Sequence, residues 1–356
     1  MPTWGQIRLE LVGLAKADAM DHGQRQERDP TAPSPHDVVR RKYLRALADY
    51  TGRPVIVYIS GWMEGRPVMD QNTISVNTRD VMGFMEVVHD LPRGPLDLIL
   101  HSPGGDQNAA EAIMKYLRDE GFGPIRAIVP VCAMSAATMM ALCCDEVLMG
   151  HHSQLGPIDP QFTLITPEGP RASPAQAILD QFNQAKDECA ASPQALAAWL
   201  PILRSYAPGL LSQCVTAQTA AEEMVSAAMH AYMFSGLPEP ERSERSKKAA
   251  EWFNDHKTHR SHGRPLRYDD VMGQEIRVSL LEDDTDELQD RVLSAWHGIQ
   301  LTLSDRAVLK LIENSNGIAW VLSGQPGFVL TPGPQEQQQQ PVPTNRQQRR
   351  QAGRRR

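Results

Sequence analysis

The stretch Leu98-Ile-Leu-His-Ser-Pro-Gly-Gly-Asp106 runs from an apolar segment through a Pro-Gly-Gly turn towards a segment with helical spacing. Glycine adopts backbone conformations that other residues cannot reach, and it lets a ligand approach the main chain. Free N–H groups at such a turn, beside the start of a helix, can stabilise a developing negative charge. A tight turn without a ligand explains the same residues, so the stretch becomes informative only together with a second one.

That second stretch is Ile128-Val-Pro-Val-Cys-Ala-Met-Ser-Ala-Ala-Thr-Met-Met-Ala-Leu142, in which Ser135 lies among small apolar residues where a strand gives way to a helix. The helix dipole favours the alkoxide character of such a serine, although a serine that only caps the helix occupies the same place. Adjacent parallel strands would bring both stretches to one edge of a sheet, where open α/β sheets bind their ligands.

Short apolar runs alternate with helical patterns through the first half of the chain. Strands are predicted at residues 55–60, 96–101, 126–130 and 146–149, and helices at 78–89, 109–120 and 135–144. This alternation implies right-handed βαβ units and a mostly parallel sheet, which is an α/β fold.

Four regions are predicted along the chain. Residues 1–50 form an N-terminal arm and a helix that Asp37 would cap, and residues 51–237 form the α/β core, with helices in its second half. Residues 238–322 form a helical C-terminal extension that begins with a charged, proline-containing link. Residues 323–356 are rich in Gln, Pro and Arg. Such a composition cannot bury a core, so a disordered tail is predicted.

Composition and charge narrow the range of functions. The chain has 36 Lys or Arg residues and 43 Asp or Glu residues, and its formal net charge is −7, which argues against nucleic-acid binding over the whole surface. The Arg-rich end could contact nucleic acid or an acidic partner, or could simply be a solubilising tail.

Five cysteines without a Cys-x-x-Cys spacing, and an N-terminus without a signal peptide, predict a cytoplasmic protein with reduced thiols. Residues 127–144 are uncharged, but their Pro, Ser and Thr favour a buried strand, turn and helix over a membrane span.

Four short motifs follow one another in the core: Ser102-Pro-Gly-Gly105, Ala133-Met-Ser-Ala-Ala-Thr138, Asp145-Glu-Val-Leu-Met-Gly150 and Ser153-Gln-Leu-Gly-Pro-Ile-Asp-Pro-Gln161. In this combination the chain resembles the Clp/crotonase-fold serine peptidases. Within them it most resembles the serine dehydrogenase proteinases, relatives of signal peptide peptidase A and ClpP. The resemblance is strong over residues 55–161 and weak onward to about residue 319. It implies a ClpP-like spiral of βαβ units, hydrolysis of peptide bonds and a ring-shaped or dimeric assembly.

The resemblance also implies roles for individual residues. Ser135 matches the nucleophile, while Gly104, Gly105 and Ala136 match the residues whose backbone N–H groups form the oxyanion hole. Attack on a carbonyl places negative charge on its oxygen, and one such donor can contribute about 3 kcal/mol to transition-state stabilisation.

The general base stays open at this point. Members of the fold with a Ser-His-Asp triad carry a histidine where this chain has Asp159, and His151 and His152 come too early. The signal-peptide-peptidase branch uses a lysine on a later helix, and Lys186 occupies a segment that resembles this helix. A lysine acts as a base only when burial lowers its pKa to roughly 7–8, which neighbours such as Phe182 could provide. A solvated lysine on an amphipathic helix is the alternative.

A histidine cluster, His256-Lys-Thr-His-Arg-Ser-His262, allows three interpretations. It forms a structural loop, or it supplies His262 as an alternative base that Asp269 or Asp270 would orient, or it binds zinc. No carboxylate or cysteine completes a familiar set of zinc ligands, so no metal is assigned.

The sequence therefore predicts a cytoplasmic serine endopeptidase with a Ser-Lys dyad, in which Ser135 attacks the peptide bond and Lys186 takes the proton. It lacks a phosphate-binding loop, so the activity is predicted to be independent of ATP and of any cofactor. Peptides or proteins are the expected substrates, and a homo-oligomer is the expected assembly. The alternatives are a catalytically inactive peptide-binding or scaffolding protein of the same fold, and an acyl-CoA enzyme of the crotonase type.

Overall fold

The computed structural model describes residues 2–22, 32–65, 71–166, 169–283 and 287–324. Their main element is a seven-stranded sheet with the strand order β11-β10-β1-β2-β3-β5-β9. The strands from β1 to β9 in this order run parallel, whereas β10 pairs antiparallel with β1 and with β11. The predicted α/β fold with a mostly parallel sheet is therefore confirmed. The strands are β1 (Val55–Ser60), β2 (Gly94–His101), β3 (Phe122–Val129), β5 (Glu146–Met149), β9 (Val278–Leu280), β10 (Val308–Asn314) and β11 (Ala319–Ser323).

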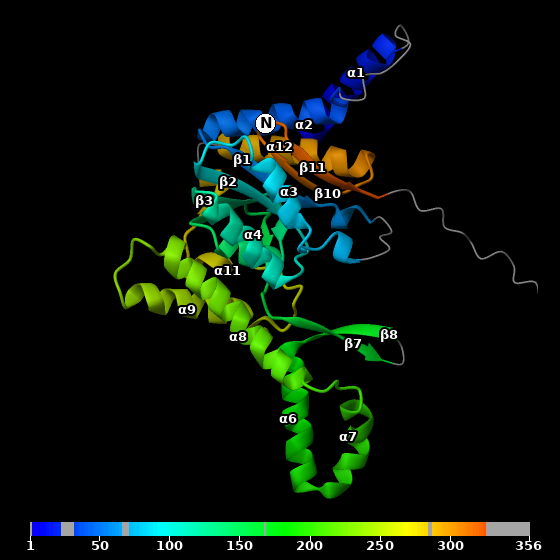
Figure 1. The fold of residues 1–356 in the computed structure, drawn as a ribbon, viewed down its shortest axis with the longest axis vertical. Coiled ribbons are helices and arrows are strands. Elements are labelled where there is room, and N and C mark those ends of the chain that lie inside the picture. Colours follow the sequence, from blue (N-terminus) through cyan, green and yellow to red (C-terminus); the bar gives the residue numbers. More distant parts are fainter. Residues whose placement is uncertain (1, 23–31, 66–70, 167–168, 284–286, 325–356) are drawn as a thin grey trace, which may run out of the picture. The chain divides into compact units, whose positions relative to one another are not determined.

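Helices cover both faces of the sheet (Figure 1). On one face lie α2 (Pro35–Thr51) and α12 (Glu287–Asp305), and on the other lie α3 (Asp80–Val87) and α4 (Gln107–Asp119). Within β1, Val55, Val57 and Ile59 contact the α2 and α12 layer. Ile56 and Tyr58 belong to the core on the opposite face. Every residue of β1 is buried, as expected for a strand with helices on both sides.

The N-terminal region contains two helices, and the residue that caps the second helix differs from the prediction. Helix α1 (Trp4–His22) packs Ile7 and Leu11 against residues of α2 and α12. Helix α2 is capped by Ser34, whose hydroxyl accepts from the Asp37 N–H at 3.3 Å, while the Asp37 carboxylate accepts from the Ser34 N–H at 3.0 Å. Asp37 is thus the third residue of a capping box and not the cap itself.

Residues 238–322 differ most from the expected helical extension. Helix α9 (Glu241–Asn254) replaces most of the predicted link, and β9, β10 and β11 join the central sheet. All seven residues of β10 are buried, including Lys310 and Glu313. Because charged residues occupy these positions, the sequence pattern does not indicate a strand here. In the fold, these charges form ion pairs with Asp80 and with arginines of α2. The described residues, which end at Gly324, form one compact unit.

The remaining elements complete the described part of the chain. Expected helices and strands of residues 55–149 are present within a few residues of their predicted ends, and an antiparallel hairpin, β7–β8, was not predicted. No helix among the described residues is both long and apolar enough to span a membrane. The predicted disordered tail lies, beyond Gly324, outside the described residues. The further elements are β4 (Cys132–Ala133), α5 (Ala136–Leu142), β6 (Gln154–Leu155), β7 (Gln161–Thr166), β8 (Gly169–Pro174), α6 (Ala175–Ala191), α7 (Leu196–Leu203), α8 (Leu210–Ala228) with a π-turn (Met229–Met233), α10 (His256–His259), α11 (Tyr268–Met272) and the short 3₁₀ turns Trp62–Glu64, Gln71–Thr73, Pro193–Ala195 and Leu281–Asp283.

Candidate active site

The two stretches singled out in the sequence meet at one edge of the sheet. Strands β2 and β3 are parallel neighbours with Ile99 opposite Ile128, so the turns that follow them leave the sheet on the same side. A cavity of about 530 Å³ lies there, and its lining includes Gly104, Gly105 and Ser135. Its place beyond the carboxyl ends of parallel strands is where α/β proteins bind ligands.

Ser135 has a backbone conformation that is rare for any residue other than glycine. Its φ is 51° and its ψ is −120°, and a residue with a side chain in such a conformation stores on the order of 1–3 kcal/mol of strain. The half-buried Ser135 connects β4 to α5, and its hydroxyl makes no capping bond to the described backbone of α5. The role of a simple helix cap is therefore excluded. The strained strand–turn–helix geometry resembles a nucleophile elbow.

The Pro-Gly-Gly turn packs directly against the Ser135 turn. A Cβ atom on Gly104, whose φ is 94°, would lie 2.5 Å from the Met134 carbonyl oxygen and 2.6 Å from the Ser135 Cβ. Hydrogen bonds join the two turns as well, because the Met134 N–H donates to the Ser102 carbonyl oxygen at 3.0 Å. Glycine at position 104 is therefore required for the close approach of the two backbones.

The backbone N–H groups at this junction have different surroundings. The Val76 N–H donates to the Gly104 carbonyl oxygen at 2.7 Å, and the Asp106 N–H donates to the Val76 carbonyl oxygen at 2.9 Å, which turns the Gly105 N–H away from Val76. The Gly104 N–H donates to the Ser102 hydroxyl at 3.2 Å and is thus engaged. Within the described residues, the N–H groups of Gly105 and Ala136 have no acceptor, so two of the three predicted oxyanion donors remain available.

A histidine and a buried carboxylate complete the cavity. His262 lines the same cavity as Ser135, and its Nδ1 lies 2.8 Å from Oδ1 of Asp159, a residue that is 1% exposed. A carboxylate at this position favours the tautomer with the proton on Nδ1 and leaves Nε2 available to accept a proton. The sequence favoured Asp269 or Asp270 as the partner of His262, but the carboxylate that binds its ring is Asp159.

Backbone pairing brings these distant residues together. Leu155 and Leu266 exchange two N–H···O bonds of 2.9 Å, and the Ile158 N–H donates to the Phe253 carbonyl oxygen at 2.9 Å. These bonds fix the histidine segment against the segment that carries Asp159. Sequence reasoning identified Asp159 only as the residue in the place of a histidine, and no local pattern indicates which later segment will pair with it.

Comparison with known proteins finds one family whose model matches part of the chain. Residues 39–196 match the family described as ClpP-like SDH-type serine proteinase. The matched segment includes Ser135, Asp159 and Lys186, whereas His262 follows it.

Two relatives in Methanocaldococcus jannaschii are similar to parts of the chain. The uncharacterized protein MJ0137 is 36% identical over 129 residues, which cover 35% of this chain and 43% of that protein. The uncharacterized protein MJ1495 is 35% identical over 152 residues, which cover 43% of this chain and 48% of that protein. The chain thus spans less than half the length of either relative. No solved structure matches the chain.

Lys186, the base expected from the wider resemblance, is exposed on α6. The buried face of α6 consists of Ala175, Ile178 and Ala185. Lys186 follows Ala185 with a rotation of about 100° around the helix axis, which turns it outward. Of the two candidate bases, only His262 lines the cavity that contains Ser135.

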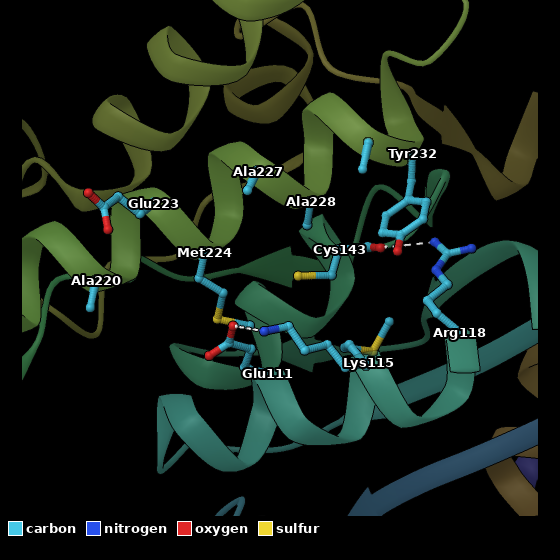
Figure 2. A pocket seen from close by; sticks show the side chains of 12 residues that line it. Glu111, Lys115, Arg118, Cys143, Ala220, Glu223, Met224, Ala227, Ala228 and Tyr232 are labelled. Carbon is cyan, nitrogen blue, oxygen red and sulfur yellow. Dashed lines mark hydrogen bonds and ion pairs between the residues drawn. The ribbon is translucent and has the colours of Figure 1, made fainter. Parts of the chain in front are cut away.

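A second cavity, of about 480 Å³, lies between α4 and α8 and offers less chemistry (Figure 2). Three of its charged groups have partners: Lys115 lies 2.6 Å from Glu111, and the guanidinium of Arg118 lies 3.8 Å from the centre of the Tyr232 ring. Burial raises the pKa of the Cys143 thiol in this cavity to about 12, which keeps the thiol protonated and unreactive. This cavity therefore supplies no nucleophile.

The side chains of the histidine cluster make contacts that can be compared with those of a zinc site. His256 and His262 direct their Nδ1 atoms to Asp159, and Nε2 of His259 lies 2.7 Å from the Trp252 carbonyl oxygen. Among the described residues, no group of three or more His, Cys, Asp or Glu side chains has the arrangement of a metal site. The observed contacts are those of a hydrogen-bonded loop.

Proposed function

We propose that this chain is a serine peptidase with Ser135 as nucleophile, His262 as general base and Asp159 as the carboxylate that orients the base. The observation that carries the proposal is that Ser135 and His262 line one cavity while the His262 ring is bound to a buried carboxylate. The match of residues 39–196 to a family of serine proteinases supports the same reaction. His262 replaces Lys186 as the proposed base because Lys186 is exposed outside that cavity.

In this mechanism the Ser135 hydroxyl attacks the peptide carbonyl carbon while Nε2 of His262 takes its proton. The N–H groups of Gly105 and Ala136 stabilise the charge on the carbonyl oxygen, to which one such donor can contribute about 3 kcal/mol. The C–N bond then breaks, and the His262 imidazolium protonates the leaving amine. A water molecule, deprotonated by His262, hydrolyses the ester on Ser135 and restores the hydroxyl. Neither ATP nor a cofactor enters this cycle.

A peptide is the substrate class that fits the cavity lining. Met139, Ile158 and Phe162 provide apolar surface, while Gln107, Asn108 and Gln161 provide polar groups for a peptide backbone. The cytoplasmic location stays a prediction, and so does the homo-oligomer. The exposed apolar residues Leu196 and Leu200 of α7 support an assembly, which sedimentation velocity would detect.

A fluorophosphonate probe tests the nucleophile, because it reacts only with an activated serine. We expect the wild-type protein to be labelled at Ser135 and to cleave an unfolded protein such as casein. Ser135→Ala should lose both labelling and cleavage while keeping its circular dichroism spectrum and its urea midpoint. Cleavage that persists in Ser135→Ala would refute the proposal.

Two further variants separate the candidate bases. His262→Ala should lose labelling and cleavage, whereas Lys186→Ala serves as the control and should retain both. The reverse result would restore Lys186 as the base. A folded wild-type protein that binds casein but neither cleaves it nor reacts with the probe would favour the inactive peptide-binding alternative.

A further inference from the structure

The Asp159 carboxylate binds more groups than the proposed triad requires. Its Oδ1 lies 2.8 Å from Nδ1 of His262, and its Oδ2 lies 3.0 Å from Nδ1 of a second histidine, His256. Gln161 donates to the same Oδ2 at 2.9 Å. One buried carboxylate therefore lies between two imidazole rings, and the mechanism above gives the second ring no role.

From this arrangement, and resting on the proposed function, we infer that His256 is a positioning residue for the peptidase reaction, which holds the Asp159 carboxylate in the orientation that binds His262.

This role is geometric. A carboxylate that bound only His262 could rotate about its Cβ–Cγ bond and present either oxygen. Hydrogen bonds from His256 and Gln161 fix Oδ2, so Oδ1 stays directed at the His262 ring. Hydrogen bonds to a charged carboxylate are among the stronger ones in proteins.

Local structure holds His256 in this place. It is the first residue of α10, where the Asp255 side chain accepts from the Lys257 N–H at 2.9 Å and so fixes the start of the helix. The His256 side chain is 19% exposed and that of Asp159 is 2% exposed. The carboxylate that His256 binds is therefore enclosed almost completely by protein.

His256→Ala and His256→Gln together test this role. His256→Ala loses the hydrogen bond to Asp159, so we expect its kcat for casein-derived peptides to fall by about ten-fold while its KM stays within about two-fold of wild type. His256→Gln can still donate this hydrogen bond, so its kcat should stay within about two-fold of wild type.

His89→Gln is the matched control, because His89 is an exposed histidine whose Nδ1 lies 2.9 Å from another aspartate, Asp90. Its kcat and KM should equal those of wild type. A wild-type kcat in His256→Ala, or a loss of kcat in His256→Gln as large as that in His256→Ala, would overturn the inference while leaving the proposed function intact. Loss of the proposed function itself would be recognised separately, by activity that persists in Ser135→Ala or His262→Ala.

Discussion

Replacing Gly104 by alanine tests whether the close approach of the two turns creates the site. The new Cβ would lie 2.5 Å from the Met134 carbonyl oxygen and 2.6 Å from the Ser135 Cβ, and both atoms belong to or adjoin the backbone. Neither can move without displacing Ser135. Gly104→Ala should therefore impair the reaction as well as the stability.

The magnitude has two parts. An alanine with positive φ costs about 1–2 kcal/mol, and inserting a methyl group where backbone must move costs typically 1–3 kcal/mol more. The free energy of unfolding should thus fall by roughly 2–5 kcal/mol. Because a displacement of about 1 Å at a reactive group can lower a rate about 100-fold, the rate of fluorophosphonate labelling should fall steeply in the molecules that remain folded.

Gly52→Ala provides the control for the strain alone. Gly52 has a φ of 64°, and a Cβ there would meet no atom within 4 Å. Urea unfolding of both variants, with equal m-values, separates the strain from the collision. The reasoning would be refuted if Gly104→Ala lost no more stability than Gly52→Ala and labelled at the wild-type rate.

Two further predictions concern the same edge of the sheet. Burial lowers the pKa of His101 to about 4 from its ordinary value of 6.5. Between pH 6.5 and pH 4 this imidazole therefore binds a proton in the unfolded chain but not in the folded chain. As the pH is lowered from 6.5 to 4, the free energy of unfolding should therefore fall by up to about 3 kcal/mol more in wild type than in His101→Phe. Urea unfolding at several pH values would measure this difference. An equal dependence of the free energy of unfolding on pH in the two proteins would contradict it. Ser135→Gly should abolish labelling but raise the free energy of unfolding by about 1 kcal/mol, because glycine relieves the strain at a φ of 51°. Ser135→Ala, which keeps a side chain there, should show no such gain, and a calorimetric comparison of the two variants would reveal it.

The fold shows which parts of the chain local patterns describe well. Strand β1 and the turns at Gly104 and Ser135 follow from β-branched runs, helical spacing and turn residues, which act over a few neighbours. Strand β10 was missed because Lys310 and Glu313 interrupt its apolar pattern. Lys310 is fully buried and lies 2.7 Å from Asp80, an ion pair across 230 positions that no local pattern reveals.

For the candidate site, the sequence alone determined the strand–turn–helix around Ser135 and its proximity to the paired glycines, because adjacent βαβ units must end at one edge of a parallel sheet. Only the tertiary structure decided which basic residue joins them. His262 reaches Asp159 across 103 positions through the pairing of Leu155 with Leu266. Lys186 lies on the outer face of its helix, because packing of the whole chain sets how each helix is rotated.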